Sequence, residues 1–296
     1  MKLGFIGLGV MGRPMALNLM KHGHEMGVYA RRPEAAAPLV EAGAQCYASP
    51  RELAARSEIV FTMVTTSSDV EQVALGENGL VEGARRGTIV VDMETISPAV
   101  ARAVAGRLAA QGIDMLDAPV SGGPAGAQHA TLSIMAGGKA HIFERVMPLF
   151  ECLGKTIVHM GDHGAGQTTK ACNQLALLVT AEGVAEALTL ARVSGLDPAR
   201  VREVMLGGIA SSRVLELFGG RMVERDFTAG IESRLYYKDL DIALDLGHRT
   251  GQALPAAALV MQHINALVGR GCGGEDLSAL LNIVEASGPV TPRRVM

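Results

Sequence analysis

The segment KLGFIGLGVMG (residues 2–12) joins a short apolar run to the spacing Gly-x-Gly-x-x-Gly. The run predicts a buried strand over residues 2–7, and the sequence that follows predicts a helix over 13–22 and a second strand over 26–29. A strand, a glycine turn, a helix and a strand within about 30 residues are typical of a dinucleotide-binding unit. The start of the chain therefore predicts an α/β domain with such a site.

The glycines of this turn each suit the binding of a dinucleotide. Without side chains they allow a tight turn, close approach of the backbone to a pyrophosphate, and packing of the helix on the strand. The helix N-terminus then presents N–H groups to the phosphates. Glycines also mark ordinary turns, so the flanking strand and helix carry the argument. We expect the cofactor to contact the whole turn: Gly7, Leu8, Gly9, Val10, Met11 and Gly12.

The residues after the second strand bear on the choice of cofactor. A site selective for NAD usually has an acidic residue here, which holds the ribose 2′-hydroxyl. This chain has Arg31 and Arg32 instead. A guanidinium offers a planar fork of donors that suits a 2′-phosphate, although a solvated basic loop is the simpler reading. We expect NADP to be preferred, with NAD as the alternative.

Strand and helix patterns alternate through the first half of the chain. Strands are predicted over 59–64, 89–92, 113–116, 131–136 and 156–160, with a helix and turn over 69–83 and helices over 98–111 and 140–150. Ligands of open α/β sheets bind at the carboxyl ends of the strands. Val64, Thr65 and Thr95 occupy such ends and are predicted to contact the cofactor; threonines there are also common as helix caps.

Residues 117–127 are rich in glycine and proline, which predicts a loop. This segment follows a strand. Ser121, Gly122 and Gly123 within it offer a hydroxyl and successive backbone N–H groups that could cradle a small carboxylate. A purely structural loop is an equally good reading of the bare string.

A long helix is predicted from Thr168 to about Val193, because apolar residues fall on more than one face and proline is absent. Its charged residues argue against a membrane span. Lys170 and Asn173 lie on one face near its start. A lysine there opposes the helix dipole, which indicates either a function or simple solvent exposure.

After this helix the strand patterns stop. Helices are predicted over 197–206, 211–222, 235–250, 255–270 and 276–286. We expect a dinucleotide-binding domain over 1–163, an interdomain helix over 164–193, an all-helical domain over 194–288 and a tail over 289–296. In the helical domain, Lys238 and Asp239 form a doublet for which a surface ion pair is the simpler reading.

Composition restricts the class of protein. Hydrophobic residues make up 48% of the 296 residues and the formal net charge is -3, so no basic field indicates nucleic acid. The four scattered cysteines lack metal-ligand spacing and do not suggest a disulfide framework. No signal peptide is recognised, so we expect a cytoplasmic protein without a metal or a membrane partner.

Four motifs occur here in an order that resembles the β-hydroxyacid dehydrogenase family: residues 4–12, 117–123, 164–173 and 238–240. The resemblance implies a Rossmann domain joined by a long helix to an all-helical domain, in a homodimer or homotetramer. It implies that Lys170 is catalytic with Asn173 beside it. It also implies that Ser121, Gly122, Gly123, Asn173 and Lys238 bind a small carboxylate substrate, and that Thr95, Lys238 and Asp239 lie at the cofactor. Glu94 stands where the family often has a serine.

The resemblance also implies an activity. Residues 132–135 and 207–216 favour reduction of tartronate semialdehyde to D-glycerate with NAD(P)H, Lys170 donating the proton. Alternatives within the family are oxidation of 3-hydroxyisobutyrate or L-threonate and reduction of glyoxylate or succinic semialdehyde. Imine reduction and a non-catalytic scaffold fit less well because Lys170 is present. A dehydrogenase of phosphorylated sugars fits less well because the helical domain lacks a visible basic cluster.

Overall fold

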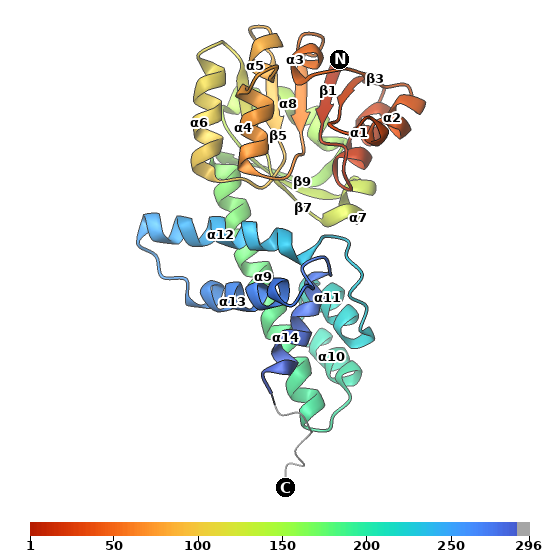
Figure 1. The fold of residues 1–296 in the computed structure, drawn as a ribbon, viewed down its shortest axis with the longest axis vertical. Helices are drawn as coiled ribbons and strands as arrows, with labels where there is room; N and C mark the ends of the chain where they lie inside the picture. Colours follow the sequence, from red (N-terminus) through yellow and green to blue (C-terminus); the bar gives the residue numbers. More distant parts are fainter. Residues whose placement is uncertain (289–296) are drawn as a thin grey trace. The chain divides into compact units, whose positions relative to one another are not determined.

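The computed structural model describes residues 1–288 and has two compact units, Met1–Lys170 and Ala171–Met296 (Figure 1). The division falls inside the long helix, so the first turn of this helix belongs to the first unit. The tail predicted over 289–296 lies outside the described residues.

The strands of the first unit form one sheet in the order β3-β2-β1-β4-β5-β6-β8-β7, with β9 paired to β8. The pairs from β3 to β6 are parallel, whereas β8 runs antiparallel to β6 and β7. This is the strand order of a doubly wound dinucleotide-binding fold, as predicted. The strands are β1 (Lys2–Ile6), β2 (Glu25–Tyr29), β3 (Gln45–Cys46), β4 (Ile59–Thr62), β5 (Ile89–Asp92), β6 (Asp114–Asp117), β7 (Val120–Ser121), β8 (Leu132–Gly137) and β9 (Gly154–Gly161).

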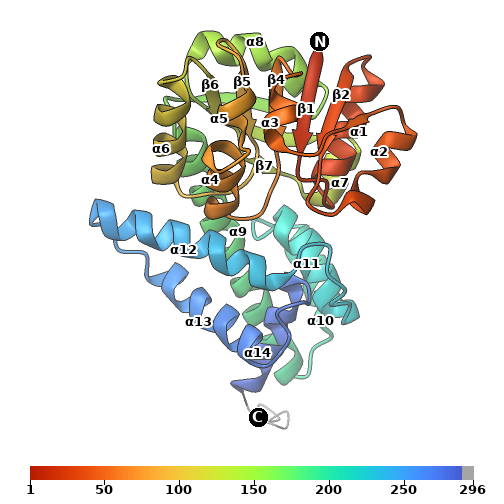
Figure 2. The same ribbon diagram turned by 45° about the horizontal axis from the view of Figure 1, so that its top comes forward.

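Helices cover both faces of this sheet (Figures 1 and 2). Successive strand residues point to opposite faces, so Phe5 packs in one core cluster with α1 and α8, and Ile6 packs in another with α4 and α6. Burial on both faces explains why these strands are apolar throughout. The helices are α1 (Gly12–Lys21), η1 (Pro33–Ala35), α2 (Ala37–Glu41), α3 (Pro50–Ala54), α4 (Ser67–Leu75), α5 (Leu80–Gly83), α6 (Pro98–Ala109), α7 (Gly123–Gln128) and α8 (Ala140–Glu151).

Among the described residues of the second unit, all the elements named below are helices, as predicted, and a single isolated β-bridge joins Glu232 to Asp276. Leu178 of α9 packs with α12 and α13, and Val184 and Leu188 pack with α11. The elements are α9 (Ala165–Val193), which begins in the first unit, α10 (Pro198–Leu206), α11 (Arg213–Glu224), α12 (Ser233–Thr250), α13 (Pro255–Gly269), η2 (Leu277–Ala279) and α14 (Leu280–Ala286).

Helix α9 is long and apolar enough to cross a membrane by length and composition alone. Its apolar residues are accounted for within the protein, since Leu178, Ala181, Val184 and Leu188 are almost fully buried in the helical core. Core helices of this kind are apolar on most faces because they are surrounded by other helices.

Three details differ from the sequence-based expectation. Helix α9 begins at Ala165, three residues before the apolar pattern that starts at Thr168 and close to the start of the interdomain helix expected over 164–193. The helix and turn predicted over 69–83 are two helices, α4 and the short α5, since the chain leaves α4 at Gly76 in an extended conformation. Residues 33–54 contain short helices and the edge strand β3, which are too brief to show a periodic pattern.

Candidate active site

The predicted site residues of the first unit gather at one edge of its sheet. Strands β1, β4, β5 and β6 are parallel and adjacent, so their carboxyl ends share an edge. The glycine turn follows β1, Val64 and Thr65 follow β4, and Thr95 follows β5. This edge includes the point between β1 and β4 where the strand order reverses, which is where ligands bind in doubly wound folds.

The three glycines of the turn have different surroundings. Gly7 has φ +93, and a Cβ there would lie 2.2 Å from the Met63 carbonyl oxygen of the neighbouring strand end. A Cβ at Gly12 would lie 1.9 Å from the Gly7 oxygen, so α1 packs directly on the turn. A Cβ at Gly9 would meet nothing within 4 Å. Two glycines thus shape the turn, and the third keeps its outer surface bare, as a closely approaching pyrophosphate requires.

The other residues of the turn divide into buried and accessible ones. Leu8 is buried in the core beside α1, so only its backbone can face a ligand. Val10 has 66% of its surface exposed, and Met11 is half-buried. The turn therefore offers a cofactor mainly backbone groups together with the side chain of Val10.

Arg31 and Arg32 lie in solvent after β2. The Arg31 Nη1 atom is 3.4 Å from the Asp69 Oδ1 atom, although 77% of the Arg31 side chain stays exposed. Asp69 is held by Thr66, whose side chain and backbone form a capping box with it at the start of α4. Thr66, which follows the predicted contact residue Thr65, is therefore a helix cap. Arg31 is accessible enough to meet a phosphate.

The segment predicted as a loop over 117–127 is more ordered than expected, and that prediction was wrong. Val120–Ser121 forms the strand β7, paired with β8, and Gly123–Gln128 forms the helix α7. Gly122 (φ +134) and Gly123 (φ +62) supply the left-handed backbone that joins them. The glycines that suggested a loop thus make one sharp corner, and Ser121, Gly122 and Gly123 all lie at it.

Lys170 lies on α9 and is 7% exposed. The preceding Gly166 lets the helix start directly against the sheet, since a Cβ there would lie 2.3 Å from the carbonyl oxygens of both Asp117 and Met135. The lysine predicted to be either functional or solvent-exposed is therefore buried. Burying an ammonium group is unfavourable unless the group is paired or hydrogen-bonded. The buried position of Lys170 therefore excludes the simple reading of a solvent-exposed lysine and favours a function.

In the second unit, Gln174 links three predicted residues. Asn173 donates from Nδ2 to the Gln174 Oε1 atom at 2.8 Å. Gln174 donates in turn from Nε2 to the Asp239 Oδ2 atom at 2.6 Å, and Asp239 lies 3.3 Å from the Lys238 Nζ atom. The ion pair expected of the Lys238–Asp239 doublet is present, and it is tied to α9. Gln174 gave no signal in the sequence beyond its place one residue after Asn173.

Two buried carboxylates lie on adjacent strands beneath the carboxyl edge. Burial raises the pKa of Asp92 to about 8, against a lowering by the Thr62 hydroxyl, which donates to Oδ1 at 2.7 Å. Its Oδ2 atom has no hydrogen-bond partner among the described residues. Burial also raises the pKa of Asp117, and the Gly164 and Gln167 N–H groups oppose that rise. Sequence patterns missed both residues because an acid at a strand end gives no sign of what it faces.

Two matching family models account for most of the chain. One is described as the NAD binding domain of 6-phosphogluconate dehydrogenase and matches residues 2–161; the other, "NAD-binding of NADP-dependent 3-hydroxyisobutyrate dehydrogenase", matches residues 164–284. The 2-hydroxy-3-oxopropionate reductase of Escherichia coli (strain K12) is 44% identical over 285 residues, which are 96% of this chain and 97% of that protein.

The chain belongs to the β-hydroxyacid dehydrogenase family. The 3-hydroxyisobutyrate dehydrogenase of Pseudomonas aeruginosa is also similar, 40% identical over 264 residues covering 87% of this chain and 89% of that one. A crystal structure of 3-hydroxyisobutyrate dehydrogenase from Salmonella typhimurium has a TM-score of 0.87 and 30% identity, with 95% of this chain and 99% of that chain covered. Psf3 in complex with NADP+ and 2-OPP has a TM-score of 0.86 and 26% identity, with 95% and 99% covered.

This β-hydroxyacid dehydrogenase is therefore an oxidoreductase that uses a nicotinamide dinucleotide. The bare outer surface at Gly9 and the N-terminus of α1 behind it fit the pyrophosphate of such a cofactor. Among residues 1–288, no three His, Cys, Asp or Glu side chains are grouped to hold a metal ion.

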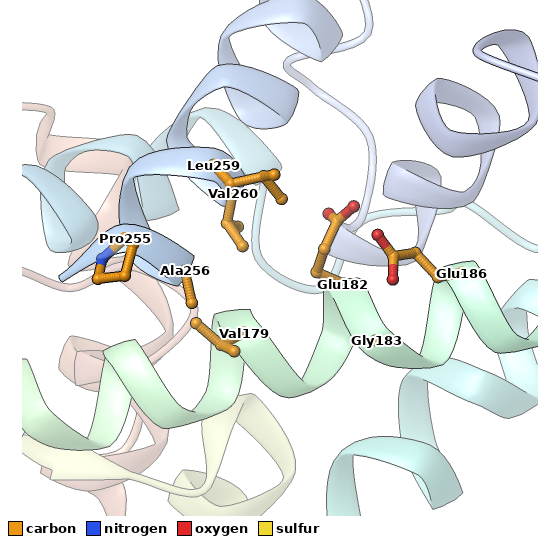
Figure 3. Close-up of a pocket in the computed structure, with 8 residues that line it drawn as sticks. All are labelled: Val179, Glu182, Gly183, Glu186, Pro255, Ala256, Leu259 and Val260. Atoms are coloured by element: carbon orange, nitrogen blue, oxygen red, sulfur yellow. The ribbon is translucent and has the colours of Figure 1, made fainter.

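The helical unit of the dehydrogenase has a separate pocket of about 430 Å³ between α9 and α13 (Figure 3). Its walls are mostly apolar, with Glu182 and Glu186 one turn apart on α9. The buried Glu182 Oε1 atom is 2.6 Å from His263 Nδ1, and burial raises the pKa of the Glu182 carboxyl. All eight residues that line this pocket belong to the second unit, and none of them is a predicted site residue.

Proposed function

We propose that this dehydrogenase reduces tartronate semialdehyde to D-glycerate. The observation that supports this substrate most directly is the 44% identity, over nearly the full length of both chains, to a 2-hydroxy-3-oxopropionate reductase. The proposed chemistry depends on Lys170, which is buried near the start of α9. It also depends on Ser121, which lies earlier in the chain, at the corner between β7 and α7.

The proposed mechanism assigns separate tasks to the residues. A reduced nicotinamide, when bound, supplies the hydride that reduces the carbonyl carbon. The Lys170 ammonium group polarises the carbonyl oxygen and donates its proton to that oxygen as the carbonyl π electrons move onto it. Asn173, on the next turn of α9, is proposed to hydrogen-bond the substrate hydroxyl. Ser121 and the backbone N–H groups of Gly122 and Gly123 hold the carboxylate, which fixes the carbonyl for attack.

The first test replaces the proton donor. Lys170→Ala is expected to lower kcat by about 100-fold or more, since general acid catalysis contributes roughly 10²–10⁴-fold. The Kd for the reduced cofactor, measured by fluorescence titration, is expected to stay close to wild type. A kcat near the wild-type value in Lys170→Ala would remove the lysine from the mechanism.

The substrate needs a second experiment, because the 40% identical 3-hydroxyisobutyrate dehydrogenase supports a sister activity. Initial rates should be compared for tartronate semialdehyde, methylmalonate semialdehyde, glyoxylate and succinic semialdehyde, and for the oxidation of 3-hydroxyisobutyrate and L-threonate. We expect the highest kcat/KM with tartronate semialdehyde. A higher value with any other compound would transfer the assignment to that compound.

We further propose that NADPH is preferred over NADH. Support comes from Arg31 and Arg32, which lie exposed after β2 where NAD-selective proteins usually carry an acid. Comparing kcat/KM for the two reduced cofactors at a fixed concentration of substrate tests this preference. A higher value with NADH would show that the arginines are only a solvated loop.

A further inference from the structure

One buried amide connects the first turn of α9 to the loop after β5. Gln167 is 0% exposed. It donates from Nε2 to the Glu94 carbonyl oxygen at 2.7 Å and accepts at Oε1 from the Ile96 N–H group at 3.0 Å. These two backbone groups flank Thr95. Gln167 makes both hydrogen bonds because an amide side chain has a donor group and an acceptor. An apolar or charged side chain of the same length could not make both at neutral pH.

A buried carboxylate fixes the same turn from the other side. Asp117, at the end of β6, accepts at Oδ1 from the Gly164 N–H group at 2.7 Å and at Oδ2 from the Gln167 N–H group at 3.0 Å. Its carboxylate thereby pairs with N–H groups at the helix N-terminus, where a negative charge is favoured. This cap explains why α9 begins at Ala165, three residues before the apolar pattern begins.

These contacts have a consequence for Lys170. Gln167 and Lys170 are three residues apart on α9, so they lie on the same face, and both are buried. The helix turn that carries the lysine is thus fixed to β6 through Asp117 and to the Thr95 loop through Gln167. Every contact in this chain of hydrogen bonds lies within residues 1–170.

We propose that Gln167 is a positioning residue for the reaction: it fixes the Lys170 amine relative to Thr95 and the loop on which the cofactor is expected to rest. The proposal builds on the proposed role of Lys170 as proton donor. Small displacements of reacting groups matter greatly, since a shift of about 1 Å can cost roughly 100-fold in rate.

The competing explanation is that Gln167 only stabilises the fold. Gln167→Leu, which keeps the size and removes both hydrogen bonds, separates the two ideas. We expect its kcat to fall by roughly 10- to 100-fold, with the Kd for NADPH within about threefold of wild type. Asp197→Ala is the matched control, since it removes the α10 cap (Asp197 Oδ1 accepts from the Ala199 N–H group at 2.9 Å) in the other unit. It should lower Tm and leave kcat unchanged.

Gln167→Glu gives a readout that a purely structural role would not produce, when kcat is expressed per folded enzyme at each pH. The ionised carboxylate keeps the acceptor for Ile96 but cannot donate to Glu94, whereas the protonated acid restores the donor. The ratio of kcat in Gln167→Glu to that in wild type should therefore rise as the pH falls. A ratio that stays constant with pH overturns the proposal, and this test also serves if Gln167→Leu does not fold.

A double-mutant cycle separates this proposal from the role of Lys170 itself. If Gln167 acts through the lysine, Gln167→Leu should change the residual kcat of Lys170→Ala by less than about threefold, although it costs far more in the wild-type background. Equal losses in both backgrounds overturn the positioning role while the lysine keeps its own. If Lys170→Ala alone retains wild-type kcat, the lysine is not the proton donor, and the positioning role that depends on it fails as well, whereas the substrate assignment is tested separately by the initial rates.

Discussion

At the scale of single residues, several ionisable side chains are buried, and burial makes their charged forms unfavourable. Lys170 is 7% exposed and Asp92 is 0% exposed. A buried ionisable group usually indicates either a function or a proton held by the fold. Lys170 belongs to the first case in the proposed mechanism. Asp92 belongs to the second, since burial favours its neutral form.

Asp92 predicts a specific dependence of stability on pH. Its pKa in the folded protein is about 8, above the ordinary value of 3.8, so the folded state keeps a proton that the unfolded state releases between these values. The free energy of unfolding therefore falls as pH rises through this window, by up to about 1.4 kcal/mol per pH unit from this group. Asp92→Asn has no carboxyl at this position and should not show this fall. The free energy of unfolding of Asp92→Asn minus that of wild type, measured by urea unfolding, should therefore increase from pH 5 to pH 8. Asp241→Asn, at an exposed position, is the control and should show no such trend.

Replacing Arg31 is expected to change the preference of the enzyme for NADPH over NADH. Arg31→Ala should lower kcat/KM for NADPH about tenfold, the equivalent of one charge-assisted hydrogen bond, and leave the value for NADH nearly unchanged. Arg51→Ala is a matched control, because Arg51 is also exposed and makes a comparably long ion pair, 3.6 Å from Glu82. Equal losses with both cofactors would mean that Arg31 does not contact a 2′-phosphate.

At the scale of elements, the glycine turn and the start of α9 use the same device. In each, glycines bring a helix N-terminus directly against strand ends: Gly12 against the Gly7 oxygen, and Gly166 against the Asp117 and Met135 oxygens. The two helices differ in what accepts hydrogen bonds from the N–H groups at the N-terminus. A carboxylate of the protein occupies the start of α9, whereas α1 has no side-chain cap and no acid in its first turn. The uncapped helix is the one that suits a phosphate.

Gly9 gives a test of the turn that separates binding from folding. A Cβ at this position meets nothing in the protein, so Gly9→Ala should leave Tm within a few degrees of wild type. It should raise the Kd for NADPH by tenfold or more, because a methyl group would stand where the pyrophosphate approaches. The control is Gly106→Ala in α6, where a Cβ also has no neighbour within 4 Å. This variant should neither lower Tm nor raise the Kd for NADPH. Unchanged cofactor affinity in Gly9→Ala would contradict the assigned cofactor position.

At the scale of the whole molecule, exposed apolar side chains are frequent between residues 190 and 217. Leu190, Leu196 and Val204 have more than half of their surface exposed, Leu217 has 49%, and Ile209 is fully exposed. Exposed apolar side chains that gather in a patch are typical of surfaces that bind a partner. We therefore propose that the dehydrogenase forms a homodimer or homotetramer through its helical unit.

Sedimentation velocity tests this assembly. Wild-type protein is expected at two or four times the mass of the chain, and Val204→Asp should shift it toward monomer because a buried unpaired charge opposes association. Val40→Asp, at an exposed apolar position of the other unit, should leave the assembly intact. A wild-type monomer at assay concentrations would contradict the proposal, as would a Val204→Asp protein that assembles normally.

The sequence by itself determined the fold class, because apolar periodicity, glycine spacing and the end of strand patterns after Val193 are local features. It also predicted the glycine turn as a cofactor site from its spacing and its flanking strand and helix, whereas Lys170 and Ser121 were predicted as site residues through the resemblance to the family. Only the tertiary structure revealed the roles of Asp117, Gln167 and Gln174. Their hydrogen-bond partners are distant along the chain, at 47 to 73 residues, and no local pattern encodes such a pairing. The corner at Gly122 was decided in the same way, since the pairing of β7 with β8 turned an expected loop into a strand and a helix.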